Sequence, residues 1–91
     1  MRPKTYSIEF TDEAIDDLKE IGEWIARDSH EAAWSLAQMP RRGRLAPEWR
    51  IDETETRQLI RHSHRVVYTI LGSTVLVITI IHGSREPRRE R

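Results

Sequence analysis

The chain has 91 residues, which is enough for one compact domain and excludes a second independent core. Hydrophobic residues make up 37% and charged residues 33%, so we expect a folded but thinly cored protein. The absence of cysteine excludes disulfides and thiolate metal sites, and no apolar run approaches the roughly 20 residues of a membrane span. We therefore expect a cytoplasmic protein that does not enter a membrane.

The formal net charge of zero conceals two halves of opposite sign. Residues 1–39 carry four basic and nine acidic side chains, whereas residues 40–91 carry eleven arginines and six acidic side chains. The planar guanidinium of arginine suits paired contacts with phosphate or carboxylate. The second half is therefore predicted either to contact an anionic partner or to present a solvated, arginine-rich surface.

The first half contains one strand pattern followed by a helical pattern. Residues 6–10 alternate apolar and polar side chains, as in a strand with one buried face. Thr11 is a favourable amino-terminal cap, and apolar residues then recur on one helical face. This pattern predicts a first helix over residues 11–27.

A second, shorter helix is expected after it. Ser29 is a suitable cap, a weak apolar face follows, and Pro40 ends the helix. Residues 41–52 mix arginine with Gly43 and proline, which indicates an irregular connection.

The second half predicts three strands, over residues 55–61, 64–71 and 74–82. The pair Gly72-Ser73 suits a two-residue turn between the last two. The third strand is apolar on both faces, so we place it centrally in the sheet.

Turn geometry then predicts the pairing of these strands. A turn at 72–73 places Arg65 opposite Ile80, with His82 one pleat further on the same face. A loop at 62–63 places Gln58 on that face as well, with Thr56 beyond it. A slip of one residue would exchange the two faces.

The order of these features, together with three short motifs, resembles the RelE/ParE superfamily of bacterial toxin–antitoxin toxins. The motifs are Pro40-x-x-Gly43-Arg44-x-x-Pro47-Glu48, His64-Arg65-Val66-Val67-Tyr68 and Ile81-His82-Gly83-x-Arg85. The first and last of them resemble the ParE-like, or plasmid stabilisation, branch more than the RelE nucleases.

The resemblance implies an α+β fold of order β-α-α-β-β-β, with a helical hairpin packed on a small, mainly antiparallel four-stranded sheet. Residues 1–91 would form a single domain, with residues 86–91 as a flexible basic tail. The expected second helix is about three turns shorter than is usual in ParE-like proteins, so we expect a truncated hairpin and a marginally stable monomer.

The resemblance implies a toxin of a type II toxin–antitoxin system that inhibits DNA gyrase and is neutralised in a hetero-oligomer by a cognate antitoxin. One alternative is a RelE-like endoribonuclease that acts on messenger RNA at the ribosome. A second alternative is an inactive interaction module that has lost part of its hairpin.

The nuclease alternative assigns catalysis to Arg65, His82 and Arg85, with His82 as a general base. Thr56 and Gln58 stand where such nucleases carry lysines. The competing interpretation is structural: Arg65 neutralises a carboxylate and His82 ends a strand. The candidate contacts with a target or nucleic acid are Arg41, Arg42, Arg44, Arg85, Arg88 and Arg89.

No cofactor and no metal are expected, because no carboxylate is placed to complete a site with His62, His64 and His82. Trp24 and Trp34 are expected at the seam between the helices, and Trp49 on the surface.

Overall fold

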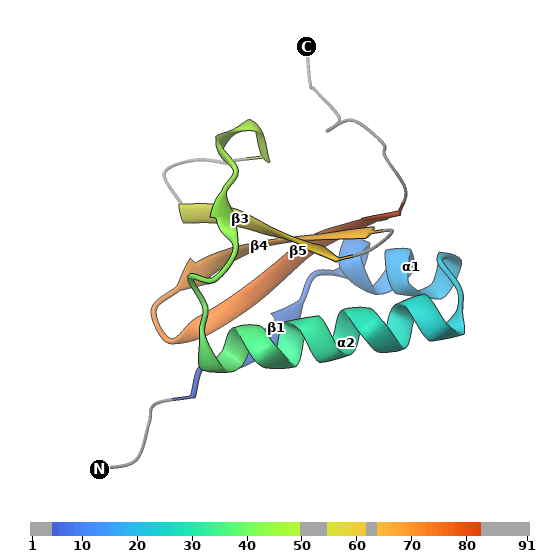
Figure 1. Ribbon diagram of the computed structural model, residues 1–91, viewed down its shortest axis with the longest axis horizontal. Coiled ribbons are helices and arrows are strands. Elements are labelled where there is room, and N and C mark those ends of the chain that lie inside the picture. The colour runs from blue at the N-terminus through green and yellow to red at the C-terminus, as the bar shows by residue number, and fades with distance from the viewer. Residues whose placement is uncertain (1–4, 50–54, 62–63, 83–91) are drawn as a thin grey trace.

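Two helices cover one face of a five-stranded sheet whose strand order is β1-β5-β4-β3-β2 (Figure 1). The computed structural model describes residues 5–49, 55–61 and 64–82. Strand β1 runs parallel to β5, and the other neighbours are antiparallel. The elements are β1 (Ser7–Phe10), α1 (Asp12–Glu20), α2 (Glu23–Gln38), β2 (Arg44–Leu45), the 3₁₀ helix η1 (Pro47–Trp49), β3 (Glu55–Arg61), β4 (His64–Leu71) and β5 (Thr74–His82).

The α+β class and the four predicted strands are confirmed, but the sheet has a fifth strand. That strand, β2, contains only Arg44 and Leu45 and pairs with β3. Two residues are too few for any periodicity, so this edge strand had no signal of its own in the sequence. The expected basic tail, 86–91, lies outside the described residues.

The predicted helix boundary is wrong. The first helix ends at Glu20, and α2 begins at Glu23 and continues for 16 residues. Gly22 separates them with φ at +96°, a value incompatible with an α-helix. Ser29, expected as a cap, is buried inside α2. The second helix is therefore longer than predicted, and the shorter helix of the hairpin is α1.

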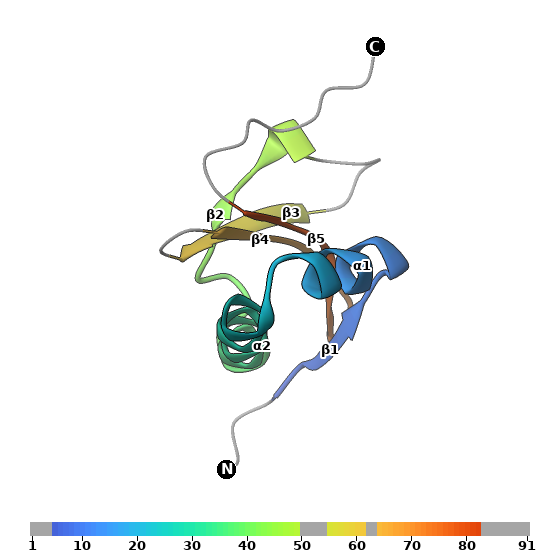
Figure 2. The same ribbon diagram turned by 90° about the vertical axis from the view of Figure 1, so that its right-hand side faces the viewer.

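The core lies between the helices and the sheet (Figure 2). Side chains from α2 pack against alternate residues of the two central strands, β4 and β5, as period-2 and helical patterns require. Tyr68 and Leu36 are its largest fully buried side chains. The buried members are Ala14, Ala32, Ala33, Leu36, Val66, Tyr68, Val75, Val77 and Ile80.

The predicted register of β3 with β4 is confirmed over its whole length, with Ile60 opposite Arg65 and Gln58 opposite Val67. The register of β4 with β5 is confirmed only from the turn as far as Tyr68, which lies opposite Val77. A β-bulge then shifts the pairing by one residue. Arg65 consequently lies opposite Ile81, and the predicted pairing with Ile80 is wrong.

The buried hydroxyl of Tyr68 fixes the chain after α2. It donates a hydrogen bond to the carbonyl oxygen of Pro40 at 2.6 Å and accepts one from the amide of Gly43 at 3.1 Å. Gly43 approaches so closely that a Cβ atom there would lie 2.6 Å from the carbonyl oxygen of Gln58 and 2.7 Å from the Tyr68 hydroxyl. This position therefore requires glycine.

We expect Gly43→Ala to lower the free energy of unfolding by about 1–3 kcal/mol, because the added methyl group meets a backbone carbonyl that cannot move without shifting β3. Urea unfolding measures the change. Gly72→Asn is the control: Gly72 has φ at +60° with no atom near its Cβ position, so asparagine should cost less than about 1 kcal/mol. Equal losses in both variants would contradict the steric explanation.

Tyr68→Phe should cost about 1–3 kcal/mol at neutral pH, because two backbone groups lose their buried partner. Burial raises the pKa of the Tyr68 hydroxyl above its ordinary value of 10.0, so the folded chain favours the protonated form that donates to Pro40. This contribution is complete below pH 10 and is lost as the pH rises through the elevated pKa. Urea unfolding between pH 7 and pH 11 should show the difference between wild type and variant narrowing above about pH 10. A difference that stays constant would contradict this.

Candidate functional site

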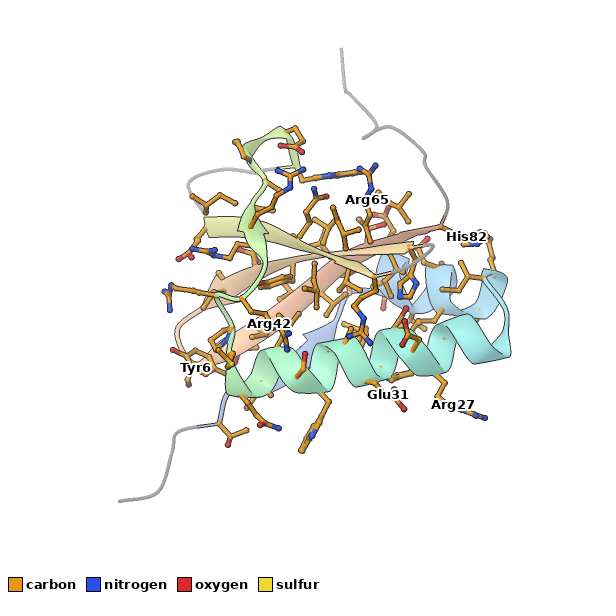
Figure 3. The ribbon with its side chains drawn as sticks, viewed as in Figure 1. Tyr6, Arg27, Glu31, Arg42, Arg65 and His82 are labelled. Atoms are coloured by element: carbon orange, nitrogen blue, oxygen red, sulfur yellow. The ribbon has the colours of Figure 1, made fainter. Side chains whose placement is uncertain are left out.

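The sheet face that the helices leave uncovered carries Arg65, one of the three residues to which the nuclease alternative assigns catalysis. We call it the open face, and in Figure 3 Arg65 projects from it, on the side away from α2. Arg65 is half-buried and lies between Ile60 on β3 and Ile81 on β5. Ile60 is 55% exposed, so this end of the open face combines one guanidinium with accessible apolar surface.

The other end of the open face is covered by residues 43–49, which we call the strap (Figure 2). The strap includes β2 and η1, and the amide of Ala46 donates to the carbonyl oxygen of Thr56 at 2.9 Å. Gln58 is 1% exposed and Thr56 is 3% exposed beneath it. These two positions, which the resemblance matches with lysines of RelE-like nucleases, are therefore neutral and shielded from solvent.

The motif Gly43-Arg44-x-x-Pro47-Glu48 builds this strap. Gly43 permits the close approach to β3, and Pro47 begins η1. The guanidinium of Arg44, which precedes η1, lies 3.6 Å from the carboxylate of Glu48 within η1. With the Gln58 amide turned to present its oxygen, that oxygen also accepts from Nε of Arg44 at 3.1 Å. The residues of this motif therefore have structural roles in forming the strap.

Arg65 and His82 do not come together, so the prediction that they are neighbours is wrong. The bulge places His82 opposite His64, on the side that faces the helices, whereas Arg65 points to the open face. His82 instead borders a small pocket of about 220 Å³. The pocket is lined by Asp17, Glu20, Ile21, Ile80 and His82. Arg85, the third predicted catalytic residue, lies outside the described residues.

Most of the described candidate contact arginines are held by carboxylates. Arg41 contacts Glu55 at 3.2 Å, and Arg44 contacts Glu48. Arg42 is exposed and forms no ion pair with any residue that the structure describes. Arg88 and Arg89 lie outside the described residues, as does Arg85.

Glu55 organises a small ionic cluster at the base of the strap. Its carboxylate accepts from Nε of Arg57 at 2.7 Å, and Arg57 also donates to the carbonyl oxygen of Gly43 at 2.6 Å. The hydrogen bond from Arg57, reinforced by Arg41, holds the pKa of Glu55 below its ordinary value. The cluster stabilises the entry to the strap, and sequence periodicity carried no signal for it.

A second ionic cluster joins α2 to the sheet. Asp28 on α2 accepts from Arg61 at 3.1 Å and lies 3.5 Å from Nε2 of His64, which is 2% exposed. Among residues 5–49, 55–61 and 64–82, no three His, Asp or Glu side chains are grouped as a metal site would require. His62 lies outside those ranges.

Two of the tryptophan predictions are wrong. Trp34 is 63% exposed on the outer side of α2, because the helix turns its alanines and Leu36 toward the sheet. Trp49, expected on the surface, is only half-exposed, and its indole nitrogen is buried in the strap. The side chain of Trp24 lies outside what the structure describes.

A shallow groove of about 580 Å³ runs between α1 and α2. Leu18 and Ala26 contribute apolar surface to it, and Lys19, Arg27 and His30 contribute nitrogen-bearing side chains. Lys19 and Arg27 are two of the four basic residues in the otherwise acidic first 39 residues. The groove therefore combines an apolar surface with a basic rim. No helix within the described residues is long and apolar enough to cross a membrane.

Solved structures share this fold. The toxin–antitoxin complex RelBE2 from Mycobacterium tuberculosis superposes with a TM-score of 0.75 at 26% identity, covering 89% of this chain and 94% of that one. The intact Escherichia coli RelBE toxin–antitoxin complex gives 0.67 at 16%, covering 88% and 99%. The chromosomal ParDE system from P. aeruginosa gives 0.61 at 20%, covering 89% and 99%.

Among curated protein sequences, none matches the chain significantly. The family model described as the ParE toxin of the type II toxin–antitoxin system parDE matches residues 8–87, which is almost the whole chain. The chain therefore belongs to the ParE toxin family of type II toxin–antitoxin systems.

Proposed function

We propose that this toxin acts by binding DNA gyrase without catalysing a reaction of its own, and that a cognate antitoxin neutralises it. The family assignment supports the ParE-like branch. Neighbours in fold include RelE proteins as well as a ParE protein, so the choice between the two modes of action depends on the open face of this chain.

The state of the open face carries the proposal. Cleavage of RNA by basic side chains needs several charges and a proton carrier at one accessible point, where they stabilise the developing charge. In the described part of the open face, Arg65 is the one cation at the accessible end, His82 is directed to the other side, and Gln58 is buried under the strap. This arrangement favours a toxin that acts by binding.

Arg42 is the described arginine that is best placed to contact an anionic partner. It is exposed next to the strap, whereas its neighbours Arg41 and Arg44 are engaged with carboxylates. An unpaired guanidinium has no internal ion pair to lose when it binds a carboxylate or phosphate. We therefore assign it to the gyrase contact.

A ribosome-dependent endoribonuclease remains the second candidate, because Arg65 occupies the open face as that activity requires. The third candidate, an inactive module, depends on the expected short second helix. That helix has 16 residues and supplies Leu36 to the core, so its length gives no support to an inactive module.

Arg65→Ala should leave toxicity within about twofold of wild type, because no catalytic step depends on it, whereas Arg42→Glu should weaken it about tenfold by reversing a contact charge. The readout is growth arrest after induced expression, with labelled thymidine and methionine incorporation over the first minutes. Early loss of thymidine incorporation is expected.

Arg42→Lys, which keeps the charge, is the control and should retain most of the toxicity. Supercoiling by purified gyrase with added toxin tests the target directly. Early loss of methionine incorporation, together with a folded but harmless Arg65→Ala variant, would contradict the gyrase proposal and favour the nuclease.

The groove between α1 and α2 is our proposed site for the antitoxin. Its apolar surface suits an amphipathic segment, and its rim of Lys19 and Arg27 suits acidic side chains beside that segment. A partner that binds only the folded toxin would also stabilise it by mass action.

The double variant Lys19→Glu, Arg27→Glu should weaken antitoxin binding by about 10- to 100-fold, since two complementary charges become repulsive. Titration calorimetry with the antitoxin encoded beside the toxin measures it. Arg42→Glu is the control for added negative charge and should bind as wild type does. Undiminished binding by the double variant would exclude the groove.

A further inference from the structure

The bulge in β5 decides on which side of the sheet His82 lies. Tyr68 pairs with Val77, but Val67 pairs with Thr79, so Ile78 has no partner on β4. In the regular register, without this shift, Arg65 would lie opposite Ile80, and His82 would reach the open face as its diagonal neighbour.

Hydrophobic burial alone distinguishes poorly between these two registers. In the bulged register Ile80 and His82 lie on the helix-covered side and Thr79 and Ile81 on the open face, and in the regular register the two pairs would exchange sides. Because each pair contains one isoleucine and one polar residue, either register supplies one isoleucine to the helix-covered side. Another interaction must select the register.

The directions of the backbone amide and carbonyl groups of β5 show that this interaction comes from α1. In a regular strand alternate residues direct their backbone groups to the same neighbour. The carbonyl oxygens of Ser73 and Val77 follow this rule, accepting from the amides of Ser7 and Thr11 at 2.9 and 3.0 Å. Continued alternation would next present the backbone of Thr79 on that side.

After the bulge, the even-numbered residues of β5 direct their backbone groups to this side instead. Thr11, the cap of α1, and Asp17 within α1 form hydrogen bonds with these groups. The Thr11 hydroxyl donates to the carbonyl oxygen of Ile78 at 2.6 Å. The amide of Ile80 donates to Oδ2 of Asp17 at 2.9 Å, and the Thr79 hydroxyl donates to the same oxygen at 2.7 Å. In the regular register the Ile80 amide would point to β4, and its bond to Asp17 would be lost.

We infer that Asp17 is a positioning residue that locks the bulged register of β5 and so keeps His82 apart from Arg65. Its carboxylate makes charge-assisted hydrogen bonds, which are stronger than neutral ones. The bonded oxygen belongs to a helix residue 63 positions before Ile80, so α1 controls the geometry of the open face. The inference concerns geometry and holds whichever cellular target the toxin has.

Asp17→Ala tests the lock, with Asp16→Ala as the matched control, since Asp16 is an exposed aspartate on the same helix. In wild type and control, nuclear Overhauser effects should join the Hα atoms of Val66 and Ile80. In Asp17→Ala, a contact between Val66 and Thr79 should appear. The Ile80 amide should exchange about 10- to 100-fold faster in Asp17→Ala than in the control.

Thr79→Val gives a second test in case Asp17→Ala does not fold. It removes one of the two bonds to the carboxylate, and Ile80 exchange should accelerate by about 2- to 10-fold. A folded Asp17→Ala that keeps the contact between Val66 and Ile80 and full protection of the Ile80 amide would overturn the inference. If Asp17→Ala is unfolded, unchanged Ile80 exchange in Thr79→Val would overturn it as well.

Discussion

A buried tyrosine hydroxyl on the helix-covered side determines much of what the opposite side of the sheet presents. Tyr68 requires two partners for its hydroxyl inside the core, and it finds them at Pro40 and Gly43. These bonds direct the chain from the end of α2 tightly past the edge of β3, where only glycine fits. The chain then continues as the strap, which buries Gln58. A hydrogen bond in the core therefore determines how much of the open face is accessible.

Several of the charged side chains in the two halves of the chain form ion pairs within the fold. Asp28 from the acidic half binds Arg61 from the basic half and ties α2 to the sheet. Within the basic half, Glu55 holds both Arg41 and Arg57. Several arginines that suggested an anionic partner thus have structural roles. The described surface available for such a partner is consequently narrower than the composition implies.

Sequence patterns predicted the parts of this fold that depend on interactions between residues close together in the sequence. The register of β3 and β4 followed correctly from alternation and a short loop, and Thr11 caps α1 as expected. The prediction of the β4–β5 register failed at the bulge, where residues far away in the sequence determine the pairing. Ile80 and Ile81 are indistinguishable by hydrophobicity, so the bulge depends on contacts from α1 that no periodicity reveals. The break between the helices at Gly22 is not apparent from periodicity, because the helical spacing of apolar residues continues past it.

The candidate site was predictable as a set of residues but not as an arrangement. Arg65 lies on the open face, as predicted, whereas the register shift at the bulge places His82 on the helix-covered side.

At its accessible end, the described part of the open face offers one half-buried guanidinium, that of Arg65, beside the exposed Ile60. Catalysis of RNA cleavage would instead need further charges at the same point, and the neighbouring positions on β3 are neutral and covered. The described part of the open face therefore supports the proposed binding role, for which we assign the charged contact to Arg42 beside the strap.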